Sequence, residues 1–159
     1  PETLLTRKFV EHVGATDVMD LLEGLSRGRF NLDSASVMLV FEAARQQDPE
    51  AISAIHWLGS ELGDLAIGVV RQLKFEELGF DLVLTGSIFK GSPLVAASVA
   101  STVHMIAPNA SLVRLTAPPV VGAVMLAMEQ VNLNPSLIRD HLIQSTNHVF
   151  GTSYDPNEE

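Results

Sequence analysis

The sequence contains no cysteine, and this absence removes several classes of chemistry. Disulfide frameworks, thiolate catalysis and cysteine-ligated zinc all need that side chain. Basic residues are scarce too, because 10 lysines and arginines face 19 aspartates and glutamates and leave a formal net charge of -9. A nucleic-acid-binding protein normally presents a basic face and aromatic stacking platforms, whereas this chain has one Trp and one Tyr. We therefore expect no nucleic-acid partner.

Long apolar runs are also missing. The apolar stretch Val120–Met128 is too short to cross a bilayer, and charged residues interrupt every longer candidate. The first residues, Pro1–Lys8, lack the basic-then-apolar pattern of a secretion signal. We expect no membrane partner and a cytoplasmic location, with which the lack of cysteine is compatible. Because the chain begins with proline rather than methionine, we expect a processed chain or a piece of a longer protein.

The composition predicts a folded chain with a buried core. Hydrophobic residues make up 47% of the 159 residues and charged residues only 18%, which fits one globular domain. Within that domain we expect a helical part over residues 1–78, an α/β part over residues 79–150 and a polar tail over residues 151–159. The nearest thing to a boundary is Glu76–Gly79, where the hydrophobic pattern changes period.

The helical part is best defined after Asp48. Asp48 is a capping carboxylate, Pro49 suits a first helical turn, and Glu50 lies near the positive helix end. Apolar residues then recur at steps of three and four and predict one long amphipathic helix to about Lys74, with the stripe Ile52, Ile55, Leu58, Leu62, Leu65, Ala66, Val69, Val70 and Leu73. Shorter helices are predicted at Thr3–His12, Asp17–Leu25 and Ser34–Gln46.

The α/β part is predicted to run strand, helix, strand, helix, helix. We expect short strands at Phe80–Thr85 and Ser111–Leu115, and helices at Ser92–Ile106, Val120–Gln130 and Asn134–Val149. Short β-to-α connections and a crossover helix predict parallel strands joined right-handedly. Two short strands do not make a stable sheet by themselves. We therefore expect either oligomerisation, for example as a homodimer, or further strands upstream of Pro1, which the absent methionine favours.

A glycine-bounded segment, Gly86–Ser92, follows the first predicted strand and precedes a helix. In open α/β folds, ligands bind outside the carboxyl end of a strand. The glycines let a ligand approach the backbone, and amides at a helix start favour an anion. A plain strand-to-helix turn is the alternative interpretation. A P-loop is excluded because Gly91–Pro93 has no lysine in the required place, and Ser87–Lys90 lacks the companion motifs of Ser-x-x-Lys acylases.

Metal-ligating and acid–base patterns are not found. None of the five histidines has a ligand spacing, and His141 and His148 lie two helical turns apart, too far to hold one metal. His56 and His104 are expected to be packed or surface residues on helices. No acidic pair can be argued to face a substrate, so we assign no catalytic residue and no metal ligand.

Three segments together carry a family resemblance. The first is Leu82–Lys90, an apolar strand that ends in Gly-Ser and continues with an apolar and an aromatic residue. The second is Val113–Ala123, a strand that leads into a helix. The third is the helical stretch from Glu2–Thr6 to Ala66–Val70. Together they resemble the carboxyl-terminal part of an actin-like ATPase domain, most closely that of N-acetylglucosamine kinases and the wider BadF/BadG/BcrA/BcrD ATPase family. Leu82–Lys90 is similar to the adenosine motif of that family.

The resemblance implies an α/β fold of the ribonuclease-H-like type, in which two lobes close on ATP and magnesium. It implies a helical insert followed by strand, helix, strand, helix, and an adenosine pocket lined by Gly86, Ser87, Ile88, Phe89 and Lys90. Gly122 and Ala123 match the helix at the interdomain hinge, although tight core packing would also explain two small residues there. The family's Asp-x-Gly-Thr phosphate loop, catalytic aspartate and sugar-binding residues have no counterpart in this chain, and Ser87 stands where a second glycine is commoner.

We expect this chain to be the nucleotide-side part of an ATP-dependent carbohydrate kinase that phosphorylates an amino-sugar hydroxyl. Its partners would be ATP, a small sugar and the remaining N-terminal lobe, and the isolated chain would be inactive. Gly86→Val is expected to weaken ATP binding and to leave the fold largely intact. Two alternatives stay open. One is an ATPase of the same family that activates a partner enzyme, for which iron–sulfur cysteines would be expected; the other is a non-catalytic assembly module whose sheet another chain completes.

Overall fold

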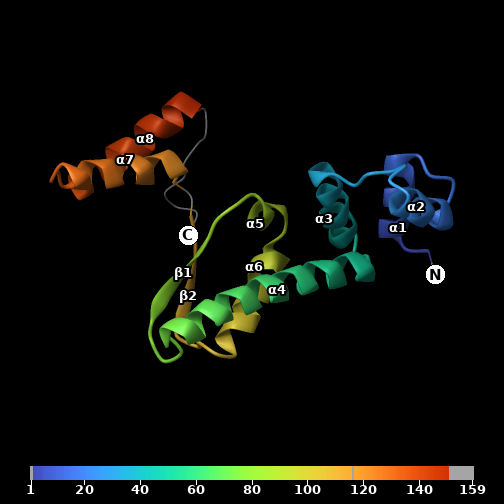
Figure 1. Ribbon diagram of the computed structural model, residues 1–159, viewed down its shortest axis with the longest axis horizontal. Helices are drawn as coiled ribbons and strands as arrows, with labels where there is room; N and C mark the ends of the chain where they lie inside the picture. Colours follow the sequence, from blue (N-terminus) through green and yellow to red (C-terminus); the bar gives the residue numbers. More distant parts are fainter. Residues whose placement is uncertain (1, 116, 151–159) are drawn as a thin grey trace. The chain divides into compact units, whose positions relative to one another are not determined.

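The computed structural model describes residues 2–115 and 117–150, and the chain divides into two compact units, residues 1–113 and 114–159 (Figure 1). The first unit runs in the order α1 (Leu4–Val13), α2 (Val18–Ser26), α3 (Val37–Arg45), α4 (Pro49–Leu73), β1 (Phe80–Leu84), α5 (Ile88–Gly91), α6 (Pro93–His104) and β2 (Ala110–Arg114), whose last residue passes the boundary. The second unit contains α7 (Pro119–Gln130) and α8 (Arg139–Phe150).

The described residues form a mostly helical α/β protein with a two-stranded parallel sheet, β1 beside β2. Both predicted strands are confirmed to within a residue at each end. The predicted helix at Ser34–Gln46 is divided, because Ser34–Ser36 forms a 3₁₀ turn before α3 begins. The predicted change of organisation near residue 78 is a change of secondary structure inside the first unit. The boundary between the two compact units falls later, after residue 113.

Helix α4 begins where its amino-terminal signals predict. The Oδ1 of Asp48 accepts a hydrogen bond from the Ala51 N–H at 3.0 Å, and Pro49 occupies the first turn. The Oδ2 of the same carboxylate accepts one from the Leu5 N–H at 3.0 Å, so Asp48 ties the start of α1 to the start of α4. The helix ends at Leu73 and is capped by Lys74, which has a left-handed backbone at φ 58° and donates its N–H to carbonyl oxygens of the last turn.

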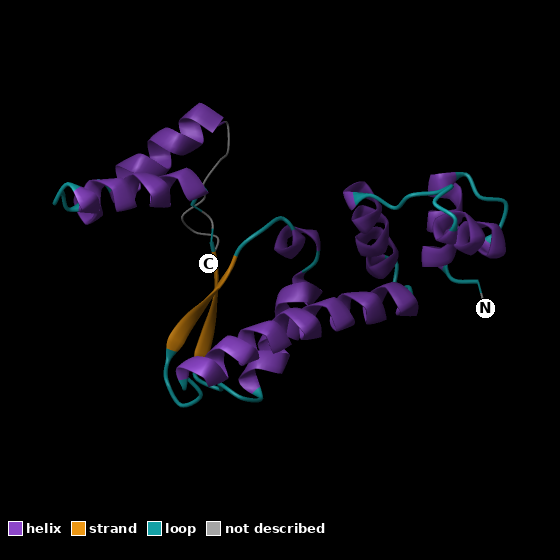
Figure 2. Cartoon of the chain, in the orientation of Figure 1, coloured by secondary structure: helices purple, strands orange, loops and turns teal. Residues whose placement is uncertain are grey.

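Helices α4 and α6, labelled in Figure 1, lie against each other (Figure 2). Small residues of α4 allow the close approach. A Cβ at Gly63 would lie 2.6 Å from the Thr102 Cβ, and one at Gly59 would lie 2.9 Å from the Val95 carbonyl oxygen. The two glycines are four residues apart and therefore share one face of α4. Both positions need glycine because the backbone of α6 and its side chains occupy the space that a methyl group would take.

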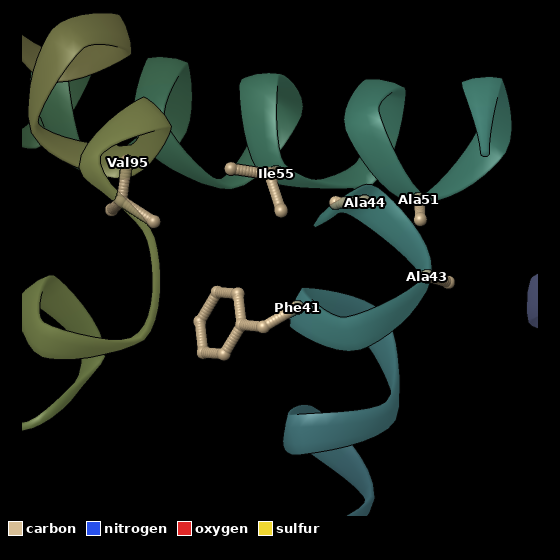
Figure 3. Close-up of a cluster of buried hydrophobic side chains, with 6 residues drawn as sticks. All are labelled: Phe41, Ala43, Ala44, Ala51, Ile55 and Val95. Atoms are coloured by element: carbon tan, nitrogen blue, oxygen red, sulfur yellow. The ribbon is translucent and has the colours of Figure 1, made fainter. Parts of the chain in front are cut away.

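The first unit is held together by two clusters of buried hydrophobic side chains. One cluster joins α3, α4 and α6 and contains Phe41, Ala43, Ala44, Ala51, Ile55 and Val95 (Figure 3). The other joins α4, α6 and the sheet and contains Val70, Leu84, Val99, Val103, Ala107 and Ala110. Full burial of a side chain of valine or isoleucine size contributes about 1.5–3 kcal/mol, so these clusters are the main stabilising feature of the unit.

The apolar stripe predicted for α4 is only partly buried. Its side chains at Leu65, Val69 and Leu73 are 71%, 55% and 53% exposed. Of the predicted stripe, Ile55 and Val70 are buried; the rest of the buried line consists of Ala51, Gly59, Gly63 and Ile67, and from Ala51 to Ile67 it runs at steps of four. Each step of four advances roughly 40° around a helix of 3.6 residues per turn, so this line drifts away from the predicted stripe. The glycines decide the direction, because α6 approaches α4 most closely where side chains are absent.

The second unit consists of α7 and α8, with a 3₁₀ turn at Pro135–Leu137 between them. The Oδ1 of Asn134 accepts a hydrogen bond from the Ser136 N–H at 3.0 Å and caps this turn. Its buried residues include Val121, Pro135 and Ile143, whereas many of its apolar side chains stay exposed: Val120, Val124, Leu126, Val131, Leu133, Leu137, Ile138 and Val149. Across residues 2–115 and 117–150, none of the helices combines the length and the apolar character needed to span a bilayer.

Candidate functional site

The loop after β1 has the backbone conformation that requires a glycine. Gly86 has φ +113°, which residues with a side chain rarely adopt, and a Cβ there would have no heavy atom within 4 Å. Within the predicted turn region Gly86–Ser92, residues Ile88–Gly91 form the single-turn helix α5, which was not predicted from the sequence. The Lys90 N–H donates to the Ser87 carbonyl oxygen at 2.9 Å and closes this turn. The loop therefore leaves the sheet with open space around Gly86.

The five residues predicted to line a pocket, Gly86–Lys90, divide into two groups. Ile88 packs against the α3–α4–α6 cluster, and Phe89 packs against both hydrophobic clusters. Gly86, Ser87 and Lys90 are exposed. Among the ion pairs of the described residues, none involves Lys90. The loop is thus anchored by its apolar pair and presents a glycine backbone, a hydroxyl and an ammonium group to solvent.

A twelve-residue helix begins directly after this loop. Ser92 is buried and its Oγ accepts a hydrogen bond from the Leu94 N–H at 3.3 Å, while Pro93 occupies the first turn of α6. Helix amino termini carry a partial positive charge from the aligned peptide dipoles. The structure therefore places the loop between the carboxyl end of β1 and the amino end of α6, where open α/β sheets bind their ligands.

Carboxylates with displaced pKa values lie in the N-terminal helices. The Thr16 N–H and the Arg29 guanidinium hold the pKa of Asp20 at about 2. An ion pair with Lys8 at 2.9 Å lowers the pKa of Glu42. Hydrogen bonds from the N–H groups of Ala51 and then Leu5 lower the pKa of Asp48. Asp20 holds the segments that flank α2, Glu42 links α3 to α1, and Asp48 links the start of α4 to the start of α1, so these shifts have a structural explanation.

Two histidines join elements of the first unit. The His56 Nδ1 lies 2.7 Å from the Oγ of Ser98, which links α4 to α6. The His104 Nε2 donates to the Ala110 carbonyl oxygen at 2.9 Å, which links α6 to β2. In the part of the chain that the structure describes, no group of three or more histidine or acidic side chains is placed to hold a metal ion.

The two small residues near the start of α7 stand in open surroundings. Gly122 and Ala123 are exposed, and a Cβ at Gly122 would have no described atom within 4 Å. Tight core packing inside the α7–α8 unit therefore does not explain why these residues are small. Their assignment to a hinge helix stays a prediction.

Sequence reasoning missed one residue that supports the loop. Phe41 of α3 is 3% exposed, and a Cβ at Gly91, the last residue of α5, would overlap its ring. No periodicity or motif connects these two residues, because they lie on different elements far apart in the sequence. The sequence shows that Gly91 is a small residue at the end of the loop, but it does not show that Phe41 is the residue packed against it.

No family model, curated protein or solved structure matches this chain. The described residues form a mostly helical α/β chain with a parallel strand pair.

Proposed function

We propose that this chain is the nucleotide-side, carboxyl-terminal part of an ATP-dependent carbohydrate kinase with a ribonuclease-H-like lobe. The observation that carries the proposal is the loop at the carboxyl end of β1, in which Gly86 has a positive φ and open space around it. The resemblance of Leu82–Lys90 to the adenosine motif of N-acetylglucosamine kinases supports the same assignment. We place the protein in the cytoplasm, where ATP is available.

The loop residues suit the adenosine side of ATP in different ways. At Gly86 the absent side chain lets the nucleotide approach the backbone. The exposed Ser87 hydroxyl can donate to or accept from a polar group of the nucleotide, and Lys90 offers a compact cation to a phosphate. Ile88 and Phe89 hold these groups in place from the core side.

The described residues fit the two expected cofactors unequally. ATP fits, because the loop offers open space at Gly86 and a lysine outside the described ion pairs. For magnesium, the described residues hold no cluster of three carboxylates or histidines. Magnesium in such sites is commonly bound through one or two carboxylates and the substrate phosphates, so the ion would arrive with ATP. This chain would then contribute nucleotide binding and no metal cage.

In the proposed reaction a sugar hydroxyl attacks the γ-phosphate of ATP, and ADP leaves. Catalysis of this kind is mostly positioning and electrostatic stabilisation of the transferred phosphoryl group. The catalytic aspartate and the sugar-binding residues would lie in the remaining lobe, so the chain alone is inactive. Two strands are fewer than an independently stable sheet usually needs, which is consistent with strands supplied by that lobe.

The experiment compares ATP binding by the complete natural protein with binding by two charge-matched variants. Lys90→Ala removes the proposed phosphate contact and raises the Kd for ATP about tenfold, since a hydrogen bond to a charged group contributes about 1.5–3 kcal/mol. Arg71→Ala removes an exposed cation of α4 that forms no described ion pair, and leaves the Kd unchanged. Equal affinity in all three proteins rejects the site. Phosphorylation of an added sugar distinguishes a kinase from a partner-activating ATPase.

The structure adds a loss of stability to the expected effect of Gly86→Val. At φ +113° a residue with a branched side chain is strained even where space is free. Gly28→Val is the matched control, because Gly28 also has a positive φ, +69°, and open surroundings. Both variants lose stability, and only Gly86→Val also loses ATP affinity if the loop binds the nucleotide.

A separate observation supports a second candidate function, that of an assembly module. Val83 and Val113, on neighbouring strands, are 52% and 41% exposed, and the described sheet has two strands. An assembly module whose sheet is completed by another chain, for example in a homodimer, would cover them. Light scattering separates this alternative: a defined dimer supports it, and a stable monomer that binds ATP contradicts it.

A further inference from the structure

One contact connects the helical part of the first unit to the candidate nucleotide loop. The ring of Phe41 points from α3 toward the side on which Val95 of α6 lies (Figure 3). Gly91, the last residue of α5, meets the edge of this ring so closely that a methyl group would overlap it. Phe41 is 3% exposed, so the ring is enclosed and has little space into which to move.

Other residues of α5 also pack against the hydrophobic cluster that contains Phe41. Ile88 and Phe89 pack against the cluster to which Phe41 belongs, and Lys90 is the exposed residue of this four-residue helix. A single helical turn has no appreciable stability of its own, because helix nucleation is unfavourable. Its position is therefore determined by the surface on which it packs, and the Phe41 ring forms part of that surface.

We propose that Phe41 is a positioning residue for the nucleotide loop, an inference that rests on the proposed function. Phe41 touches α5 rather than the nucleotide, and it acts by fixing where Ser87 and Lys90 stand. Because packed interiors transmit strain, a change of volume at the Phe41–Gly91 contact moves α5 and with it the groups that meet ATP. Helix α3 thereby becomes part of the nucleotide site.

The test is a double-mutant cycle in the complete natural protein. Gly91→Ala forces a methyl group against the ring, and Phe41→Leu removes the ring edge and leaves a gap. Each variant alone raises the Kd and the KM for ATP about tenfold, while the KM for the sugar stays unchanged. The double variant recovers the affinity to within about twofold, because the smaller side chain makes room for the methyl group.

A core variant elsewhere separates positioning from general destabilisation. Leu21→Ala, on α2 and 6% exposed, lowers the stability of the same unit at a residue that belongs to neither of the two clusters on which the loop packs. It leaves the KM for ATP unchanged. If Phe41→Leu behaves like Leu21→Ala, with lower stability and unchanged ATP affinity, the inference is overturned and the proposed function stands.

NMR measurements on the amides of the Gly86–Gly91 segment distinguish failure of the inference from failure of the proposed function. If the unmodified protein binds no ATP, the proposed function and the nucleotide role of Phe41 fail together. Hydrogen exchange of the Lys90 N–H, which donates to the Ser87 carbonyl oxygen inside α5, reports on how firmly this turn is held without a ligand. Exchange that is faster in Phe41→Leu and slow again in the double variant supports positioning, and unchanged exchange in Phe41→Leu contradicts it.

Discussion

The α4–α6 packing of the first unit and the α7–α8 pair of the second differ in how their apolar residues are used. In the first, glycines at 59 and 63 bring two helices together, and buried side chains line the contact. In the second, α7 is apolar over nearly its whole length, yet its side chains at Leu126 and Val124 stay exposed. A helix that is apolar on all sides is typical of a buried environment. The first region is stabilised by its own packing, whereas the second presents an apolar surface of the kind that another surface normally covers.

The largest difference in the free energy of unfolding is expected between truncating a buried side chain of the first unit and an exposed one of the second. Ile55→Ala removes a residue that is 1% exposed and should lower the free energy of unfolding by about 2–5 kcal/mol. Leu137→Ala, at a residue 83% exposed, should change it by less than about 0.5 kcal/mol. Urea unfolding measures both. Similar losses in the two variants would contradict the contrast between the regions.

Within α4 we expect smaller changes in the free energy of unfolding, with opposite signs at two glycines. Gly63→Ala places a methyl group against Thr102 and should destabilise the first unit by about 1–3 kcal/mol. Gly68→Ala, on the same helix with nothing within 4 Å, should stabilise it by up to about 1 kcal/mol, because alanine favours the helix. Thermal unfolding of the two variants checks this. Stabilisation by Gly63→Ala would show that α4 and α6 are not held so closely.

The smallest effect is expected for acid sensitivity of the first unit. Hydrogen bonds from Ala51 and Leu5 lower the pKa of Asp48 in the folded state, so the unfolded state binds the proton more readily. The stabilisation is therefore complete above the ordinary pKa of aspartate and is lost as the pH falls through the lowered folded value. Asp48→Asn should flatten the dependence of unfolding on pH below about 4, near the ordinary aspartate pKa. An unchanged pH profile in this variant would remove Asp48 from the acid response.

Acid sensitivity has a second contributor in the same unit. The pKa of Asp20, about 2, lies below the ordinary aspartate value, so its stabilisation is lost as the pH falls toward 2. Asp20→Asn is the matched comparison, because it removes the charge that pairs with Arg29 and leaves both the Asp17 cap of α2 and the junction of α1 and α4 in place. Its effect on α4 amide exchange should be absent.

Local signals were enough to predict the two strands and the longer helices but not which of their residues are buried. Asp48, Pro49 and the periodicity after them predicted α4, and apolar runs predicted both strands, because these patterns depend on neighbours in the sequence. The buried line of α4 could not be derived in this way. It depends on Gly59 and Gly63, whose meaning appears only when α6 is placed against them.

The candidate loop was also predicted only in part from the sequence. The glycine bounds and the position after a strand predicted where the loop lies, and the positive φ at Gly86 agrees with that interpretation. Helix α5 was missed because four residues bounded by glycine and serine carry no periodic pattern. The support from Phe41 was missed because a contact between distant residues leaves no mark in their spacing.

The most direct test of the nucleotide proposal is an NMR titration of the complete natural protein with magnesium–ATP. The proposal predicts saturable changes of the amide shifts of Gly86–Lys90 and of the first turn of α6, with Lys90→Ala weakening the response and Arg71→Ala leaving it intact. Saturable changes confined to other residues, or none at millimolar ATP, would contradict the assignment of this loop to a nucleotide.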